Sequence, residues 1–565
     1  MPPYHQSPDP TGSLLLSALL ALLPLVTLLF LLGGLRWKAH WAGLATLGVA
    51  LLVAVAGYGM PPLLALDAGL FGMAQSLLLI LWLTFNAIWI YNLTVHSGHF
   101  AVLRRAFGTL GEDIRVQAIV IAFCFGALLE ALAGGGGPVA ICSVMLIALG
   151  VSPLRAAALA LVADTAPVAF GGMGNPITVL GEVTGLPAAE FGAIAGRQVS
   201  VLAVAVPFVL LIVADGRRGI RQAWPAALVG GLSFAVAQFL TSNYLSYQLA
   251  DIVAAVVSAG AILLLLRVWQ PGEPVTAALL PDDGDAARTP AAEPARSREA
   301  GGTVATAPTT SDPGGGNSLT ATGSRAETVR AFAPYLIIVL VFALAQFDSV
   351  MAPLKALTWS FDWPGLTVLT AEGAPVDTEY EFAIGSATGT LLLLSGLLAL
   401  PFLRVRPKDA LLVYGRTLRQ FGWAILAILA VFALSYVMNL SGQIHTLGVW
   451  LAGTGAFFAF LSPVVGWFGV TITGTDAGAN ALFGGLQTTA AEQIGADPVL
   501  LGAANSSGGV MAKMISPQNL AIGTAAVGLV GREGELFRRV FGWSLLIMCT
   551  LVYLQSTPVL SWMLG

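Results

Sequence analysis

Charged side chains are scarce in this sequence of 565 residues. Asp, Glu, Lys and Arg together make up 10% of it, whereas about 25% is usual in soluble domains. A water-soluble fold of this length could not cover its surface with so few charges. The net charge is only −4, and no block of Lys and Arg residues suits a polyanion. The composition therefore argues against a soluble enzyme, a disordered protein and a nucleic-acid partner.

Cysteine and histidine are also rare. Cys124, Cys142 and Cys549 lie in apolar stretches without the spacing of metal ligands, and we interpret them as buried reduced thiols. None of the five histidines belongs to an HExxH pattern, and the chain has no GxSxG nucleophile motif. We therefore expect no metal, no cofactor and no enzymatic activity.

Hydrophobic residues, by contrast, make up 56% of the chain, and 65 glycines add to them. The pattern predicts an all-α polytopic membrane protein with about 12 spanning helices at roughly 20 apolar residues each, plus two re-entrant hairpins and two interrupted helices. No Lys or Arg precedes the first run, which argues against a cleaved signal peptide. Long apolar runs lie at 14–35, 41–58, 67–95, 197–214, 223–242, 249–267, 331–347, 384–403, 421–439 and 541–564.

One region breaks this pattern, because 271–330 is rich in Pro, Gly, Ala, Ser and Thr with few large apolar side chains. We interpret it as a flexible cytoplasmic linker between two halves. The expected organisation is an N-terminal span (1–40), a first inverted repeat (41–222), connecting spans (223–270), the linker, a span with an extracellular loop (331–383) and a second inverted repeat (384–565).

Basic residues orient the spans, because short cytoplasmic loops carry the excess of Lys and Arg. The basic residues all lie on the cytoplasmic face of the membrane only if 115–150 enters and leaves the membrane on that side, as a re-entrant hairpin. The second hairpin, 463–495, then opens to the outside, and 443–461 lies along the interface. If 443–461 crossed instead, the basic residues near 538 would move outside. The two halves are therefore expected to have opposite orientations.

An internal alignment supports two copies of one unit. It pairs several short motifs that occur in the same order in both halves. A single match has no weight in a chain so rich in Gly and Ala, but the shared order does. Inverted repeats with interrupted helices are typical of secondary transporters whose site lies near the bilayer midplane. The alternative is that glycines only permit close helix packing. The pairs are Ser97-Gly98 with Ser441-Gly442, Phe125-Gly126 with Phe468-Gly469, Gly150 and Pro153 with Gly495 and Pro498, and Pro176 with Pro517.

The first hairpin contains the sequence ALLEALAGGGGPVAI, residues 127–141. Its glycines allow backbone amides to approach an anion, and the proline restarts a helix whose N-terminus favours a carboxylate. Substrate-binding candidates here are Gly134, Gly135 and Gly136. Glu130 is the first candidate for the coupled proton, because an ionised carboxylate at membrane depth is costly. Alternatively, its carboxyl is hydrogen-bonded to the hairpin backbone.

The second hairpin contains TGTDAGANALFGG, residues 473–485. Thr475 and Asn480 are substrate-binding candidates, since each can donate a hydrogen bond to a hydroxy acid. Asp476 is a second candidate for proton coupling. Alternatively, Asp476 caps a helix that begins near Ala477.

Interrupted helices are expected within 154–190 and 498–530, where VADTAPVAFGGMGNPI (162–177) and AANSSGGVMAKMISPQNLAI (503–522) combine small polar residues, glycine and proline. Proline interrupts the helical ladder, and the freed backbone groups can serve a ligand. Asp164 is a third proton-coupling candidate. The substrate-binding candidates are Thr165, Asn175, Asn505, Ser506, Lys513 and Ser516.

Lys513 lies far from either end of its apolar stretch. An ammonium at that depth needs a counter-charge. The substrate carboxylate, Asp164, Glu130 or Asp476 could supply it. The alternative is a permanent internal ion pair.

At these residues the chain resembles the L-lactate permease family of bacterial proton symporters. The resemblance covers nearly the whole chain apart from the linker, and it implies a multipass permease that takes up L-lactate, and often D-lactate and glycolate, with protons. It also implies a transport domain with two hairpins that moves against a scaffold. The matching stretches are FCFGALLEALAGGGGPVAI, DTAPVAFGGMGNPI, GRQV at 196–199, DGRRGI at 215–220, GTDAGANALF and ANSSGGVMAKMISPQ.

On this resemblance Glu130, Asp476, Asn480, Asn505, Lys513 and Ser516 stand at family motif positions, whereas Asp164 replaces an expected asparagine. We expect proton symport of small 2-hydroxy monocarboxylates across the bacterial cytoplasmic (inner) membrane. The expected partners are the carboxylate, protons and membrane lipid, and the oligomeric state stays open. Alternatives are a sodium-coupled or exchange transporter of another small carboxylate, and a structural or sensory membrane protein.

Overall fold

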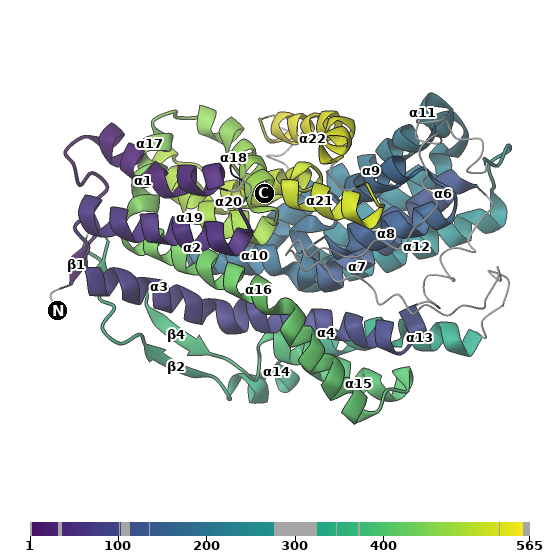
Figure 1. Ribbon diagram of the computed structural model, residues 1–565, viewed down its shortest axis with the longest axis horizontal. Helices are drawn as coiled ribbons and strands as arrows, with labels where there is room; N and C mark the ends of the chain where they lie inside the picture. Colours follow the sequence, from purple (N-terminus) through teal and green to yellow (C-terminus); the bar gives the residue numbers. More distant parts are fainter. Residues whose placement is uncertain are drawn as a thin grey trace.

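The computed structural model describes residues 3–31, 35, 37–100, 102, 113–134, 136–275, 325–345, 347–370, 373–529 and 532–556. Helices dominate this part of the chain, and they pack side by side along the length of the molecule (Figure 1). The prediction of a mostly helical polytopic protein is therefore confirmed. Short strands occur in addition.

Two long helical rods lie along one side of the molecule and cross each other (Figure 1). One runs continuously through α3, a π-helical segment and α4, and the other is α16, whose first half also contacts α4. Helices α13 and α15 pack on each other and on α4. The bounds are α3 (Pro62–Ser76), the π-helical segment η3 (Leu77–Trp82), α4 (Leu83–His96), α13 (Arg325–Leu344), α15 (Thr388–Leu403) and α16 (Pro407–Leu440).

The first hairpin consists of two helical arms that meet at Gly134 and Gly136. After it, a straight helix ends at a break, a second helix follows, and two long helices complete the first half. The bounds are α6 (Ile114–Ala118), η4 (Ile119–Phe125), α7 (Gly126–Ala133), α8 (Gly137–Ala148), α9 (Pro153–Ala163), η5 (Val168–Phe170), α10 (Gly171–Thr184), α11 (Ala188–Tyr244), η6 (Tyr247–Leu249) and α12 (Ala250–Val268).

The second half repeats this order with a hairpin, a straight helix, a break and a further helix. The arms of its hairpin meet at Gly474 and Thr475. Helices α1, α2 and α17 pack together at the other end of the molecule (Figure 1). The bounds are α1 (Leu14–Leu29), α2 (Ala39–Leu52), η2 (Val53–Gly57), α17 (Gln443–Ala452), α18 (Phe457–Thr473), α19 (Asp476–Ile494), α20 (Pro498–Ala512), η9 (Lys513–Ile515), α21 (Pro517–Ala526) and α22 (Glu533–Ser556).

Backbone conformations recur at positions that the internal alignment pairs. Gly98 and Gly442 have φ values of 76° and 88°, and Gly150 and Gly495 have 94° and 69°. The proline that follows each of the latter two glycines opens the next helix, α9 or α20. The same chain bends are therefore used twice. That the two copies are inverted stays a prediction.

Five helices of the described residues are long and apolar enough to cross a membrane, or up to seven if each of two bent pairs is one span. The longest, Ala188–Tyr244, contains a kink at Asp215 and Gly216. The predicted spans 197–214 and 223–242 lie on the two sides of that kink. The total of about 12 spans and the re-entrant character of the hairpins stay predictions.

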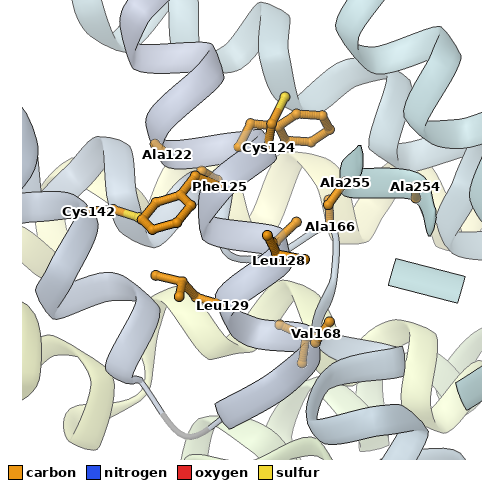
Figure 2. Packing of buried hydrophobic residues seen from close by; sticks show 14 of the residues in the cluster. Ala122, Cys124, Phe125, Leu128, Leu129, Cys142, Ala166, Val168, Ala254 and Ala255 are labelled. Atoms are coloured by element: carbon orange, nitrogen blue, oxygen red, sulfur yellow. The ribbon is translucent and has the colours of Figure 1, made fainter. Parts of the chain in front are cut away.

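The core of the first half contains many alanines among larger apolar residues, and such small side chains let helices approach closely. Figure 2 shows residues of this core, among them Phe125, Cys142, Ala166 of the break and Ala255 of α12. Cys124 and Cys142 are buried as expected, whereas Cys549 is exposed. The interpretation of all three cysteines as buried thiols is therefore wrong for Cys549, because it lies on an outer face of α22.

Four short strands lie outside the helices and were not predicted. They pair into two small two-stranded ribbons, one of which joins the N-terminal residues to the segment after α14. Tyr4 donates hydrogen bonds to the carbonyl oxygens of Tyr58 and Ser441, both at 3.0 Å. The N-terminus is thereby attached to both halves. The bounds are β1 (Tyr4–His5), parallel to β3 (Val368–Leu369), β2 (Trp359–Asp362), antiparallel to β4 (Glu379–Phe382), and α14 (Asp348–Lys355).

Most of the predicted linker, 276–324, lies outside the described residues. Its two ends differ from the prediction, because 325–330 already belong to α13 and 271–275 are packed against the first hairpin. Arg115, at the base of that hairpin, donates to the carbonyl of Glu273 (3.1 Å), and the amide of Val275 donates to Asp113 (3.2 Å). Residues 271–275 and 325–330 therefore have a defined structure that the composition did not indicate.

Arg115 is fully buried and is the centre of an ionic network at the base of the first hairpin. Its guanidinium contacts Asp113 Oδ2 at 2.6 Å, Asp215 Oδ2 at 3.1 Å and Gln222 Oε1 at 2.8 Å. Asp215 lies at the kink of α11. The network therefore holds the hairpin base, the kinked helix and the chain after α12 together.

Candidate functional site

The second break presents a lysine inside the protein. Helix α20 ends in a 3-10 turn, and Ser516 is extended (φ −65°, ψ 138°) because Pro517 disfavours a helical conformation in the residue before it. Ser516 Oγ then accepts hydrogen bonds from the backbone N of Asn519 at 3.4 Å and from its Nδ2 at 2.8 Å, which caps α21. The turn leaves Lys513 buried, with 4% of its side chain exposed.

Lys513 forms ion pairs with two carboxylates of the other half of the chain. Its Nζ contacts Oε1 of Glu130, in the last turn of α7, and lies 3.0 Å from Oδ2 of Asp164, the C-cap of α9. Both carboxylate side chains are 4% exposed. The structure therefore brings together three residues predicted for the site, and it pairs Lys513 with Glu130 and Asp164 rather than with Asp476.

These ion pairs leave part of each carboxylate unused. Glu130 Oε2 and Asp164 Oδ1 are buried and have no hydrogen-bond partner among the described residues. Removing one partner from a buried ion pair leaves an uncompensated charge, which costs about 3–5 kcal/mol. A ligand or a proton that reaches these oxygens would consequently change the energy of the whole cluster.

The first break brings a second glycine-rich segment against Glu130. Helices 153–163 and 168–184 meet at a bend of 65°, and Gly172, Met173 and Gly174 all have positive φ. A Cβ atom on Gly171 would lie only 2.7 Å from Glu130 Oε1. Glycine is therefore needed here for close approach. Met173 is a non-glycine residue at φ 62°, a strained conformation of the kind found at functional sites.

Other predicted residues of this break have different surroundings. Thr165 donates its hydroxyl to the carbonyl of Val162 at 2.6 Å, so it already has an acceptor. Asn175 Oδ1 is buried without a partner among the described residues. Gly135 lies outside the described residues, whereas Gly134 and Gly136 have φ values of 57° and 83°.

Both hairpin tips lie against the first turn of α21. Asn519 Nδ2 donates to the carbonyl of Gly474 at 3.2 Å, and a Cβ atom on Gly136 would lie 2.8 Å from Asn519 Oδ1. Asn519 thus contacts both tips, although it was not predicted as a site residue. The available signal was its position three residues after the serine cap of α21.

The second hairpin tip is stabilised by its own cap. Thr475 is the N-cap of α19 and its Oγ1 accepts from the amide of Gly478 at 3.2 Å. The alternative that Asp476 caps this helix is therefore wrong. Asp476 is buried, and its Oδ2 accepts from Ser506 at 2.5 Å. Its Oδ1 has no partner among the described residues.

Two predicted amides belong to a chain of hydrogen bonds between elements. Asn480 Nδ2 donates to the carbonyl of Pro176 at 3.0 Å, Asn505 Nδ2 donates to Asn480 Oδ1 at 2.9 Å, and Gln487 Nε2 donates to Asn505 Oδ1 at 3.0 Å. These contacts connect the second hairpin to α10. In this conformation Asn480 and Asn505 therefore have a positioning role.

The comparisons agree with this architecture. A mostly helical chain with several candidate spans, and with two breaks that meet at buried charges, is a polytopic membrane protein of the transporter class. A family model described as L-lactate permease matches residues 17–559. The chain belongs to the L-lactate permease family.

Three relatives match almost the whole chain. The glycolate permease GlcA of Escherichia coli is 41% identical over 95% of this chain and 94% of its own. The L-lactate permease of Bacillus subtilis is 40% identical over 98% of both chains, and that of Salmonella typhimurium is 39% identical over 99% of both. The YdaH transporter of Alcanivorax borkumensis covers 84% of both chains at 13% identity, but its TM-score of 0.39 is too low to define the fold.

Proposed function

We propose that this protein takes up L-lactate and related small 2-hydroxy monocarboxylates, including D-lactate and glycolate, by proton symport across the bacterial cytoplasmic membrane. Relatives named L-lactate permease and glycolate permease support the substrate class. The observation that carries the proposal is Lys513, a buried ammonium that joins the breaks of the two halves and pairs with Glu130 and Asp164.

The charges of this cluster favour coupling to protons. One ammonium and two carboxylates carry a net charge of −1, so a substrate anion that enters beside Lys513 raises the buried negative charge to −2. Such a charge is unfavourable at low dielectric constant. A proton on Glu130 or Asp164 neutralises the carboxylate that the substrate displaces from Lys513. Substrate and proton therefore bind together and leave together.

The surrounding backbone supplies further groups for an organic acid. Helices α8, α19 and α21 all begin at or beside the glycine-rich tips, and a helix N-terminus favours a negative charge. Asn519 and Ser516 add polar side chains at the point where both tips converge. We assign the substrate carboxylate to Lys513 and these N-termini, and the 2-hydroxyl group to the polar side chains.

The unused oxygens of Glu130 and Asp164 also favour a second candidate, sodium coupling, because Na⁺ is bound by oxygen ligands of this kind. Uptake of labelled L-lactate into proteoliposomes separates the two. The proton version predicts accumulation with an imposed pH gradient, acidic outside, in sodium-free buffer. Accumulation that requires a sodium gradient would support the second candidate instead.

The substrate assignment is tested by competition with a panel of acids in the same vesicles. We expect unlabelled L-lactate, D-lactate and glycolate to reduce uptake of labelled L-lactate, and dicarboxylates to have little effect. If L-lactate itself neither accumulates nor competes with any labelled acid, the substrate class is wrong.

A further inference from the structure

A third buried carboxylate lies close to the Lys513 cluster and has no role in the proposed function. Asp251, in the first turn of α12, is fully buried. Gln238 connects it to the carbonyl of Ala166, two residues after Asp164 in the first break. Figure 2 labels Ala254 and Ala255, in the next turn of α12, and Ala166 of the first break, which belong to the same buried cluster.

Asp251 is held by a single glutamine. Gln238 Nε2 donates to Asp251 Oδ1 at 2.8 Å and to the carbonyl of Ala166 at 3.3 Å, while Gln238 Oε1 accepts from Ser200 at 3.1 Å. Asp251 Oδ2 is buried and has no hydrogen-bond partner in the part of the chain that the structure describes. One neutral donor is little stabilisation for an ionised carboxylate in a protein interior.

The buried acids near the first break outnumber the lysine that pairs with them. Lys513 is paired with Glu130 and Asp164, and Asp251 adds a third buried acid, which Gln238 links to the first break. With all of them ionised the group has a charge of −2, and Lys513 is already engaged by the other two acids. Asp251 therefore needs its own neutralising cation, and its free oxygen Oδ2 is the place for it. A proton is the cation that needs no further ligands.

We propose that Asp251 is a second proton-carrying residue of the transport cycle, linked to the first break through Gln238. This inference rests on the proposed function. On the outer side a proton from water adds to Oδ2 and gives a neutral acid, and on the inner side the same proton returns to water and leaves the carboxylate. Together with the proton on Glu130 or Asp164, two protons then accompany one monocarboxylate. Each cycle moves one net positive charge inward.

Net charge movement makes a specific prediction for wild-type protein. A membrane potential, negative inside, should increase the accumulation of L-lactate in addition to the pH gradient. For one net charge the accumulation ratio rises tenfold per about 59 mV. Proteoliposomes with a potassium diffusion potential, set by valinomycin at a fixed pH gradient, measure this dependence directly.

The test uses Asp251→Asn, which keeps the size of the side chain and removes the proton site. We expect this variant to retain uptake driven by the pH gradient, with one proton for each substrate, and to lose the tenfold response to potential. Ser258→Ala is the matched control, because Ser258 lies on the same helix and donates only to the carbonyl of Gly230 and contacts Cys124. It should respond to potential as wild type does.

The uptake measurements distinguish a failure of the Asp251 assignment from a failure of the proposed function. An equal response to potential in wild type and Asp251→Asn, or no response in either, overturns the assignment of Asp251 while pH-driven uptake still supports the proposed function. Absence of pH-driven uptake in wild type refutes the proposed function itself. Uptake by wild type that follows a sodium gradient at constant pH, and is lost in Asp251→Asn, refutes the proton assignment in favour of a sodium site.

A second variant keeps the carboxyl in case Asp251→Asn does not insert. Gln238→Leu removes the hydrogen bond that favours the ionised form, so the proton is held more tightly and its release needs a higher internal pH. The response to potential should be lost at neutral internal pH and return when the vesicle interior is made alkaline. A wild-type response at every internal pH contradicts the proposal.

Discussion

The ammonium of Lys513 lies 3.0 Å from a carboxylate oxygen of Asp164, although the two residues belong to different halves of the chain. Each is at a helix break that contains a proline, Pro167 in the first and Pro517 in the second. The contact therefore joins the two breaks directly. It also makes transport and structural integrity depend on the same side chain, that of Lys513.

Replacing Lys513 by alanine should abolish L-lactate uptake. It also leaves Glu130 and Asp164 as buried carboxylates without a partner, at a cost of about 3–5 kcal/mol. We expect a lower unfolding temperature in detergent but normal membrane insertion. The triple variant Lys513→Met, Glu130→Gln and Asp164→Asn should recover stability without recovering uptake. Uptake by either variant would exclude Lys513 from the site.

Glu130→Gln should separate substrate movement from proton movement. The amide fits the same space but cannot take up or release a proton, so exchange of internal for external lactate should continue while accumulation driven by pH is lost. Both activities are measured in the same vesicles with labelled L-lactate. If Asp164→Asn shows this behaviour and Glu130→Gln does not, the carried proton belongs to Asp164.

Gly171→Ala should impair uptake by steric conflict with Glu130. The new Cβ would lie 2.7 Å from Oε1 of Glu130, and such overpacking costs about 1–3 kcal/mol. Gly260→Ala is a control in α12, where the added methyl group has open space. The control should retain wild-type uptake and thermal stability. Equal uptake by the two variants would show that the approach of Gly171 to Glu130 has no functional role.

Arg115→Met should destabilise the protein far more than Arg218→Met. Arg115 is fully buried between Asp113 and Asp215, and loss of such a partner costs about 3–5 kcal/mol. The side chain of Arg218 is 46% exposed and contacts Asp215 at 3.3 Å, so its loss costs at most about 1 kcal/mol. Unfolding temperatures of the purified variants measure the difference. Similar temperatures would argue that the Arg115 network contributes little to stability.

Local sequence signals were sufficient to find the breaks. Runs of glycine followed by proline, such as Gly134 to Pro138, disfavour a continuous helix. The same holds for the segment before Pro176. The approximate hairpins and breaks therefore follow from short-range chemistry, whereas an exact boundary such as Thr475 depends on which side chain forms the cap.

Contacts between the halves were harder to predict from the sequence. The pattern gave Lys513 three possible acidic partners, and the choice of Glu130 and Asp164 depends on which break docks against which. Asp476 instead faces Ser506, because α18, α19 and α20 pack together. Asp251 was missed because one acid near the start of an apolar run resembles an ordinary helix terminus.

The ribbon between β1 and β3 changes how the long segment between the halves should be viewed. Because the N-terminal strand pairs with residues 368–369, and Lys513 pairs with Glu130, contacts among the described residues join the two halves. A chain cut within that segment should stay one particle through purification. Gene fragments expressed separately offer a route to labelling each half on its own.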